Sequence, residues 1–222
     1  MIFPALACQL RVTTRVMPLQ AGGGDICDTL VTPFGVRLLI GDVMGSGEPA
    51  HETAQQVVAA WRELAVAEPS LPGVAIRLHT LIARSADPER FVTALLVTFG
   101  CCSTGMEVVC CGHPAPLLLR GASASFTETF PAPPLGLLDL ADGWCTATTM
   151  PFTAGDRLLL YTDGVTEARD AAGRYFPLSE AAVAAAVAGQ SDDEVLDHLA
   201  AALRTYVADK QADDILLMMA SR

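Results

Sequence analysis

Four short motifs place aspartates where the chain leaves a strand: Gly-Gly-Asp at 23–25, Gly-Asp-Val at 41–43, Thr-Asp-Gly at 162–164 and Ala-Asp-Asp at 212–214. No Lys or Arg lies inside any of them. A fold that gathers the four brings like charges together, and two carboxylates about 4 Å apart repel by roughly 4 kcal/mol at an effective dielectric near 20. Such a set needs protons or divalent cations to be stable. The motifs therefore predict a metal site built from carboxylate oxygens.

The elements that position these aspartates must fit one folding unit. At 222 residues and 51% hydrophobic content, the chain is expected to form a single domain over residues 1–222. Its net charge of -11 and its single lysine, Lys210, argue against a nucleic-acid partner, because binding a phosphate backbone requires clustered Lys and Arg. The longest apolar run, around 91–102, is shorter than the roughly 20 residues of a membrane span. We expect a cytoplasmic protein with no membrane contact.

The cysteines offer a rival metal site. There are seven, and the vicinal pairs Cys101–Cys102 and Cys110–Cys111 suit a reducing compartment better than a disulfide framework. A zinc cluster from these four is the alternative. If a hairpin turn follows Cys102, Cys110 falls opposite about Val97, roughly 13 Å from Cys101 at 3.3 Å per residue. This spacing disfavours zinc.

Short apolar runs separated by Gly and Pro predict strands at both ends and in the middle of the chain, with paired helices between them. We therefore expect an α+β fold of two packed antiparallel β-sheets flanked by helices on both faces. Residues 121–143, rich in Ala, Ser, Pro and Gly, are expected to form a surface excursion. The predicted strands are 8–19, 26–31, 36–43, 91–100, 106–111, 114–119, 157–162 and 215–220, and the predicted helices are 49–64, 72–84, 178–188 and 192–208.

Seven segments carry a more specific pattern by their order along the chain. They are Gly23–Asp28, Gly41–Gly47, Ala94–Phe99, Gly112–Leu117, Pro134–Leu137, Gly155–Ala168 and Asp213–Ile215. Together they resemble the SpoIIE-like branch of the PPM (PP2C-type) serine/threonine phosphatases from about residue 8 to residue 220. The segment at 155–168 is the most specific of them.

The resemblance implies a site for two divalent cations, Mn or Mg, at one end of a β-sandwich. Asp42 would bridge the two ions and, with Asp163, carry the catalytic role. Asp163 and Asp213 would complete the first ion's ligands, and Asp25 and the carbonyl of Val43 would hold the second. Oxygen ligands independently favour Mg or Mn over Zn. Phosphoserine and phosphothreonine would be hydrolysed by attack of a hydroxide that bridges the metals.

Four further residues are weaker candidates. Asp214 lies beside Asp213 and could also be near metal. His113 could act as an acid toward the leaving oxygen, although a His between Gly and Pro at a strand end is more often structural. For Asp28 and Glu167 the interpretation as supporting or surface acids is favoured over metal ligation.

The resemblance also implies a partner. The substrate would be a phosphoprotein, such as a phosphorylated anti-sigma-factor antagonist of a bacterial partner-switching pathway. Regulation would come from a partner, from a homodimer or from metal supply. Met44, Ser46 and Leu216 depart from the usual family pattern. The altered loop at 41–47, which contains Met44 and Ser46, motivates the alternative, a catalytically degenerate phosphatase fold that binds a regulatory partner without turnover.

Overall fold

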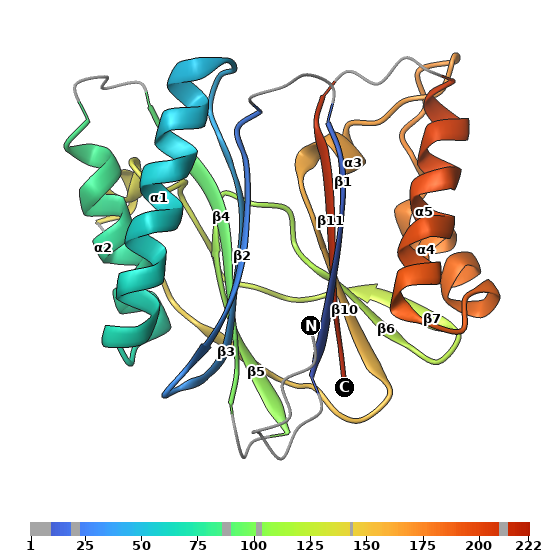
Figure 1. Cartoon of the computed structure of the whole chain (residues 1–222), viewed down its shortest axis with the longest axis horizontal. Helices are drawn as coiled ribbons and strands as arrows, with labels where there is room; N and C mark the ends of the chain where they lie inside the picture. The colour runs from blue at the N-terminus through green and yellow to red at the C-terminus, as the bar shows by residue number, and fades with distance from the viewer. Residues whose placement is uncertain (1–9, 19–22, 86–89, 101–103, 143, 209–212) are drawn as a thin grey trace.

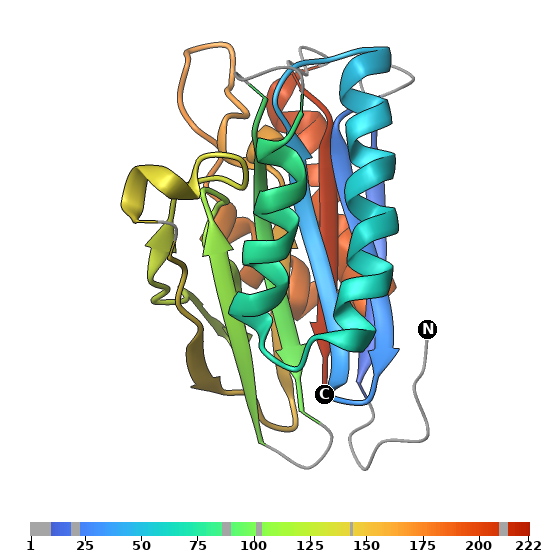
Figure 2. The same ribbon diagram turned by 90° about the vertical axis from the view of Figure 1, so that its left-hand side faces the viewer.

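Two β-sheets lie face to face between two pairs of helices in the computed structural model (Figure 1). This arrangement confirms the predicted α+β fold class. The helices α1 (Glu48–Ala67) and α2 (Leu71–Ala83) cover one sheet and lie nearest the viewer in Figure 2, while α4 (Leu178–Ala188) and α5 (Asp192–Val207) cover the other sheet, as Figure 1 shows. The structure describes residues 10–18, 23–85, 90–100, 104–142, 144–208 and 213–222.

The sheet beneath α4 and α5 has the strand order β1-β11-β10-β6-β7, with all neighbours antiparallel. Its β11 is buried on both faces: Leu216 and Met218 pack against the second sheet, whereas Leu217 and Met219 pack against the helices. This double burial explains the uninterrupted apolar run of β11. The strands are β1 (Arg11–Met17), β6 (Leu117–Arg120), β7 (Ser123–Phe126), β10 (Asp156–Tyr161) and β11 (Ile215–Ser221).

The sheet beneath α1 and α2 has the order β2-β3-β4-β5-β8, and β9 also pairs with β5. The β5–β8 pairing, which covers two residue pairs, is parallel, whereas the other strand pairs of this sheet are antiparallel. β8 holds two residues and begins with Pro131, which cannot donate to a ladder and suits an edge. The strands are β2 (Asp25–Thr32), β3 (Gly35–Val43), β4 (Val92–Phe99), β5 (Gly105–Cys111), β8 (Pro131–Ala132) and β9 (Thr148–Pro151).

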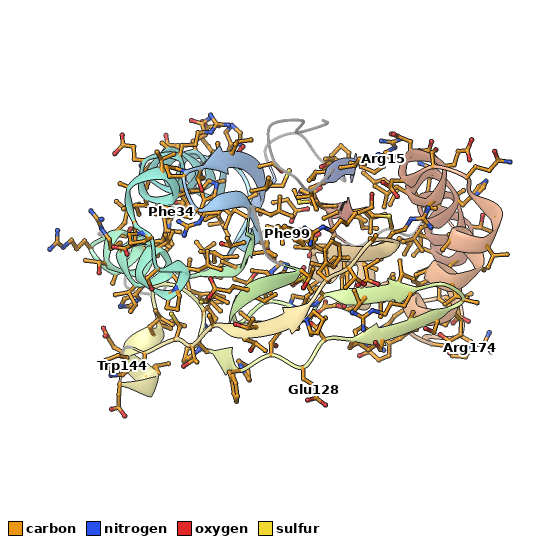
Figure 3. The ribbon with its side chains drawn as sticks, turned by 90° about the horizontal axis from the view of Figure 1, so that it is seen from below. Arg15, Phe34, Phe99, Glu128, Trp144 and Arg174 are labelled. Carbon is orange, nitrogen blue, oxygen red and sulfur yellow. The ribbon has the colours of Figure 1, made fainter. Side chains whose placement is uncertain are left out.

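A buried arginine fastens α1 to this sheet. Arg37 lies in β3 and donates hydrogen bonds to three carbonyl oxygens just after or within the last turn of α1, those of Ala65 (2.9 Å), Glu68 (2.6 Å) and Pro69 (2.5 Å). Its guanidinium also lies 4.7 Å from the ring centroid of Phe34, which is labelled in the view from below (Figure 3). Carbonyl groups at a helix C-terminus have no hydrogen-bond donor within the helix, and the Arg37 guanidinium provides the donors here.

The region 121–143 is more ordered than a surface excursion. It contains β7, β8 and the 3-10 helix η1 (Leu138–Ala141), and β9 follows shortly after it. These strands are short and lack apolar alternation, so they depend on pairing with β6 and β5. The chain also forms a helical turn, α3 (Asp163–Thr166), where only a strand end was expected.

The predicted register of the cysteine hairpin is wrong by two residues, because Cys110 pairs with Leu95 and not with Val97. Cys101 and Cys102 lie outside the described residues. Cys110 and Cys111 are free, buried thiols, and Cys110 Sγ contacts the carbonyl oxygen of His113 at 3.0 Å. Within the described ranges, none of the helices has both the length and the hydropathy that a bilayer span requires.

Candidate metal centre

Two of the predicted ligands face each other across neighbouring strands. Asp25 is the first residue of β2 and pairs directly with Asp42 near the end of β3. Residues opposite each other in an antiparallel pair project from the same face, and like charges in this position destabilise the sheet. The fold therefore places two carboxylates together where ordinary sheet stability would disfavour them.

The electrostatics of the pair reflect this crowding. Burial, followed by the charge of Asp42, raises the pKa of Asp25 to about 8. Burial, followed by the charges of Asp163 and Asp213, raises the pKa of Asp42 to about 7. Each carboxyl thus has negative neighbours in place of a compensating cation. A bound divalent ion would reverse the balance and favour the ionised forms.

The opposite sheet contributes the other acids. Asp163 follows β10 as the first residue of α3, and Asp213 and Asp214 precede β11. Burial, followed by the charges of Asp213 and Glu167, raises the pKa of Asp163. Because β10 and β11 are hydrogen-bonded neighbours, their adjoining loops lie at the same end of the sheet, beside Asp25 and Asp42 of the other sheet.

Thr162 joins the two halves of the site. Its Oγ1 donates to Oδ2 of Asp25 at 3.2 Å and accepts a hydrogen bond from the backbone N–H of Leu216 at 3.0 Å. The Thr162 N–H in turn donates to the Leu216 carbonyl oxygen at 3.1 Å. A residue of the β10 end thus orients a carboxylate of β2. In the sequence Thr162 stands out only as part of Thr-Asp-Gly, and no local pattern indicates a partner as distant in the chain as Asp25.

Gly24 leaves room for two predicted ligand oxygens. A methyl group at Gly24 would lie 2.7 Å from the carbonyl oxygen of Val43 and 2.8 Å from Oδ1 of Asp42. The Gly24 carbonyl also accepts the N–H of Val43 at 3.2 Å. Gly23 gives similar room to the carboxylate of Asp214, which a methyl there would overlap. The two glycines keep a cradle open beside the strand ends.

His113 is hydrogen-bonded to residues that adjoin the predicted ligands, Thr93 opposite Asp42 and Tyr161 at the end of β10. The ring is buried, and burial lowers its pKa to about 4, so it is neutral at physiological pH. Since the carbonyl oxygen of Tyr161 only accepts, Nε2 carries the hydrogen in their 3.0 Å contact, and Nδ1 then accepts from Oγ1 of Thr93 at 3.1 Å. That same Oγ1 lies 3.5 Å from the Asp42 carbonyl oxygen. This geometry favours a structural role, and the catalytic interpretation stays a prediction.

Asp28 and Glu167 lie farther from the pair. Asp28 pairs with Leu39 in the ladder and accepts from Nε of Arg62 at 2.8 Å, so its charge is matched. Glu167 is exposed after α3, and its N–H donates to the Asp163 carbonyl oxygen at 2.8 Å. Glu167 acts on the site through its charge on Asp163.

The donor set suits a hard cation. All predicted ligands are oxygens, which Mg and Mn prefer. Among the described residues, no three His, Cys, Asp or Glu side chains stand close enough to hold one ion together. The absence of a side chain at Gly24 leaves space beside Oδ1 of Asp42 and the carbonyl oxygen of Val43. The oxygen donors and the space beside Gly24 therefore suit a hard divalent cation.

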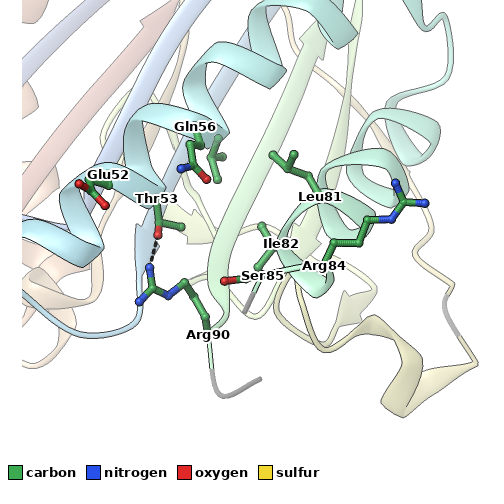
Figure 4. A pocket seen from close by; sticks show the side chains of 9 residues that line it. Glu52, Thr53, Gln56, Leu81, Ile82, Arg84, Ser85 and Arg90 are labelled. Carbon is green, nitrogen blue, oxygen red and sulfur yellow. Dashed lines mark hydrogen bonds between the residues drawn. The ribbon is translucent and has the colours of Figure 1, made fainter. Parts of the chain in front are cut away.

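A separate pocket of about 340 Å³ lies between α1 and the end of α2 (Figure 4). Arg90 lines the pocket and donates hydrogen bonds to Oγ1 of Thr53 at 2.5 Å and to the Pro49 carbonyl oxygen at 2.9 Å. None of the described aspartates of the four motifs lines this pocket. Arg90 thereby secures the start of α1, which follows the Asp42 loop.

Comparison with known proteins identifies relatives of this arrangement. The family model for stage II sporulation protein E (SpoIIE) matches residues 32–222. The RsbU and RsbW domains of Rv1364c from Mycobacterium tuberculosis are 24% identical with a TM-score of 0.81, covering 96% of this chain and 60% of that one. The PP2C phosphatase domain and regulatory fragment of SpoIIE from Bacillus subtilis is 14% identical with a TM-score of 0.83, covering 98% and 64%.

A further solved structure contains metal. The catalytic domain of the serine threonine protein phosphatase PstP in complex with 2 manganese ions is 20% identical with a TM-score of 0.68, covering 96% of this chain and 97% of that one. At these identities the likenesses show the fold. The chain spans about three fifths of the length of the first two structures.

Proposed function

Because the chain belongs to the SpoIIE family of PP2C-type phosphatase domains, we propose that it is a metal-dependent protein phosphatase that hydrolyses phosphoserine and phosphothreonine. The observation that carries the proposal is the pairing of Asp25 with Asp42. Burial and neighbouring negative charges raise the pKa of Asp25 to about 8 and the pKa of Asp42 to about 7. Perturbed carboxyls at one end of a fold are typical of functional sites.

Each side chain has a distinct part in this proposal. Asp42 would contact both ions, Asp163 and Asp213 would complete one ligand set, and Asp25 with the carbonyl of Val43 would complete the other. Manganese or magnesium, when bound, would acidify water and offset charge on the phosphoryl oxygens. The protein's own contribution would be to hold Asp25 and Asp42 on paired strands, with Asp25 also oriented by Thr162, so that less ordering remains at the moment of reaction.

A phosphorylated anti-sigma-factor antagonist is the substrate that we propose. The similar chain from Mycobacterium tuberculosis carries an RsbU domain together with an RsbW domain, and another similar structure comes from the bacterial stressosome. Both likenesses support a partner-switching setting. The net charge of -11 also disfavours polyanionic nucleic acid as a partner.

The test is manganese-dependent hydrolysis of para-nitrophenyl phosphate and of a phosphoserine protein. The Asp42→Asn, Asp163→Asn double variant should reduce turnover at least about a thousandfold, because both ions would lose a ligand. The matched control is the Asp193→Asn, Asp197→Asn double variant, which changes two carboxylates on α5 that pair with Arg15 at 2.8 and 2.7 Å. Equal rates for wild type and the Asp42, Asp163 variant would defeat the enzyme proposal.

A partner-binding protein without turnover is the second candidate, favoured by Met44 and Ser46, which depart from the usual family pattern in the loop that follows Asp42. It predicts binding of a phosphoprotein with no release of phosphate at saturating manganese. Phosphate release that depends on Asp42 would exclude it.

A further inference from the structure

A groove of about 500 Å³ opens beside Asp25 at the edge of the sandwich. It lies between the start of β2, the adjoining ends of β1 and β11, and the exposed side of α1. Aliphatic groups predominate along its walls, with polar side chains toward α1. The lining residues are Val16, Asp25, Ile26, Cys27, His51, Ala54, Gln55, Val58, Ala59, Arg62 and Leu216.

The strand pattern orients the two walls toward each other. Val16 and Leu216 are direct partners in the β1–β11 ladder, and Leu216 faces the space between the sheets. In β2, Cys27 packs toward that same space, and Asp25, two residues earlier, lies on the same face. Asp25 and Val16 therefore border one opening between the sheets.

Val16 is unusual because it is a large apolar side chain that is 55% exposed in this opening. By contrast, Val12, which lies on the same face of β1, is buried. An exposed valine opposite a buried leucine gives the groove an apolar wall that water contacts in the free protein. Covering that wall would release the water and favour binding of an aliphatic group.

Asp25 belongs both to the groove and to the candidate metal centre, so the two are continuous. Because Asp25 shares the groove lining with Val16 and Leu216, polypeptide adjoining a phosphoryl group at the centre would lie beside these two side chains. We propose that the groove binds an aliphatic side chain, such as leucine, from the segment that flanks the phosphorylated residue of the protein substrate. This inference rests on the proposed function and adds a substrate preference to it, an aliphatic residue near the phosphorylated one.

The polar rim suits a peptide more than a lipid or a small apolar ligand. Gln55 and His51 are hydrogen-bonded to each other at 2.9 Å on the α1 side, where they can meet backbone groups. Among the described lining residues Arg62 is the one arginine, and its side chain, 60% exposed, pairs with Asp28 at 2.8 Å, which weakens its attraction for a phosphate or a lipid headgroup. Selection in the groove therefore depends on apolar burial.

The experiment uses phosphoserine peptides in which one leucine is moved along an otherwise Ser, Gly and Ala sequence. Para-nitrophenyl phosphate serves as the substrate that has no flanking polypeptide. At the preferred position, leucine should lower KM about tenfold relative to serine, while kcat stays unchanged. Val16→Ser should abolish most of this preference. Ala59→Gln, which narrows the groove from α1, should do the same.

Two matched controls separate the groove from general effects. Val31→Ser changes a valine of similar exposure, 51%, on the same edge of the fold but outside the groove. Ala67→Gln makes the α1 substitution at the exposed end of the helix, also outside the groove. Both controls should keep the leucine preference, and all four variants should hydrolyse para-nitrophenyl phosphate at the wild-type rate.

Three outcomes overturn the inference in different ways. Equal KM for every peptide, with intact hydrolysis of para-nitrophenyl phosphate, would remove the groove and leave the proposed function standing. Self-association that Val16→Ser abolishes, without a leucine preference, would assign the groove to a second copy of the chain. Failure of the wild type to hydrolyse para-nitrophenyl phosphate would defeat the proposed function and this inference with it.

Discussion

Replacing Asp25 with asparagine should stabilise the metal-free protein near pH 8. Burial and the charge of Asp42 raise the pKa of Asp25 from 3.8 to about 8 in the folded state, whereas the unfolded chain titrates near the ordinary value. The folded state therefore binds this proton more tightly. The free energy of unfolding is highest when pH lies below both values, and it falls as pH rises from about 4 to about 8. Asparagine removes this loss.

The size of the effect follows from the shift. A displacement from 3.8 to about 8 sets an upper limit of about 5 to 6 kcal/mol above pH 8. The Asp25 carboxyl borders an open groove, and solvent screening reduces the effect to about 2 kcal/mol. For a chain of this length, that corresponds to a rise in Tm of about 4 to 8 °C at pH 8, with little change near pH 4.

The assay is thermal unfolding with a chelator present, followed from about pH 4 to about pH 8. Asp28→Asn is the matched control, because it makes the same chemical change three residues along β2 but removes a partner of Arg62. It should leave Tm unchanged or lower it slightly at every pH. Manganese should stabilise the wild type more than Asp25→Asn. Parallel pH profiles for wild type and Asp25→Asn would refute the reasoning.

Substitutions at three further positions probe the surroundings of the Asp25–Asp42 pair. Gly24→Ala fills the cradle beside two predicted ligand oxygens, so manganese affinity measured by calorimetry should fall at least about tenfold, and unchanged affinity would speak against a site there. Thr162→Val should lower the free energy of unfolding in urea by about 2 kcal/mol, because it removes the donor to Asp25 and strands a buried N–H, while Thr162→Ser should restore it. His113→Phe should cost about 2 to 3 kcal/mol through its two lost hydrogen bonds; wild-type stability with a reduced kcat would instead support a catalytic role.

The sequence was most informative where a local pattern coincided with a strand end. The apolar runs before Asp42 and Asp163 predict where each strand ends, and the observed strands β3 and β10 agree within one or two residues. The direct pairing of Asp25 with Asp42 follows from a short hairpin between two such runs. The central β11 was also predictable, because its length and apolar content suit a strand buried on both faces.

Contacts between distant segments explain what was missed. Nothing near Arg37 in the chain indicates that its guanidinium would reach carbonyls at the end of α1. The bond from Thr162 to Asp25 joins residues on different sheets and depends on how the sheets pack. β7 and β8 carry polar or proline-containing sequence and form because β6 and β5 offer them edges. Such features follow from the fold and not from local propensity.

The candidate ligands are divided between the sheets, with Asp25 and Asp42 on one and Asp163 and Asp213 beside strands of the other. Ions bound by all four aspartates would link the two sheets to each other. Parting of the sheets and release of the ions would then be a single event, so manganese should slow amide hydrogen exchange in β3 and β10 together. Cellular metal supply would thereby set how long the protein resists proteolysis as well as how fast it turns over.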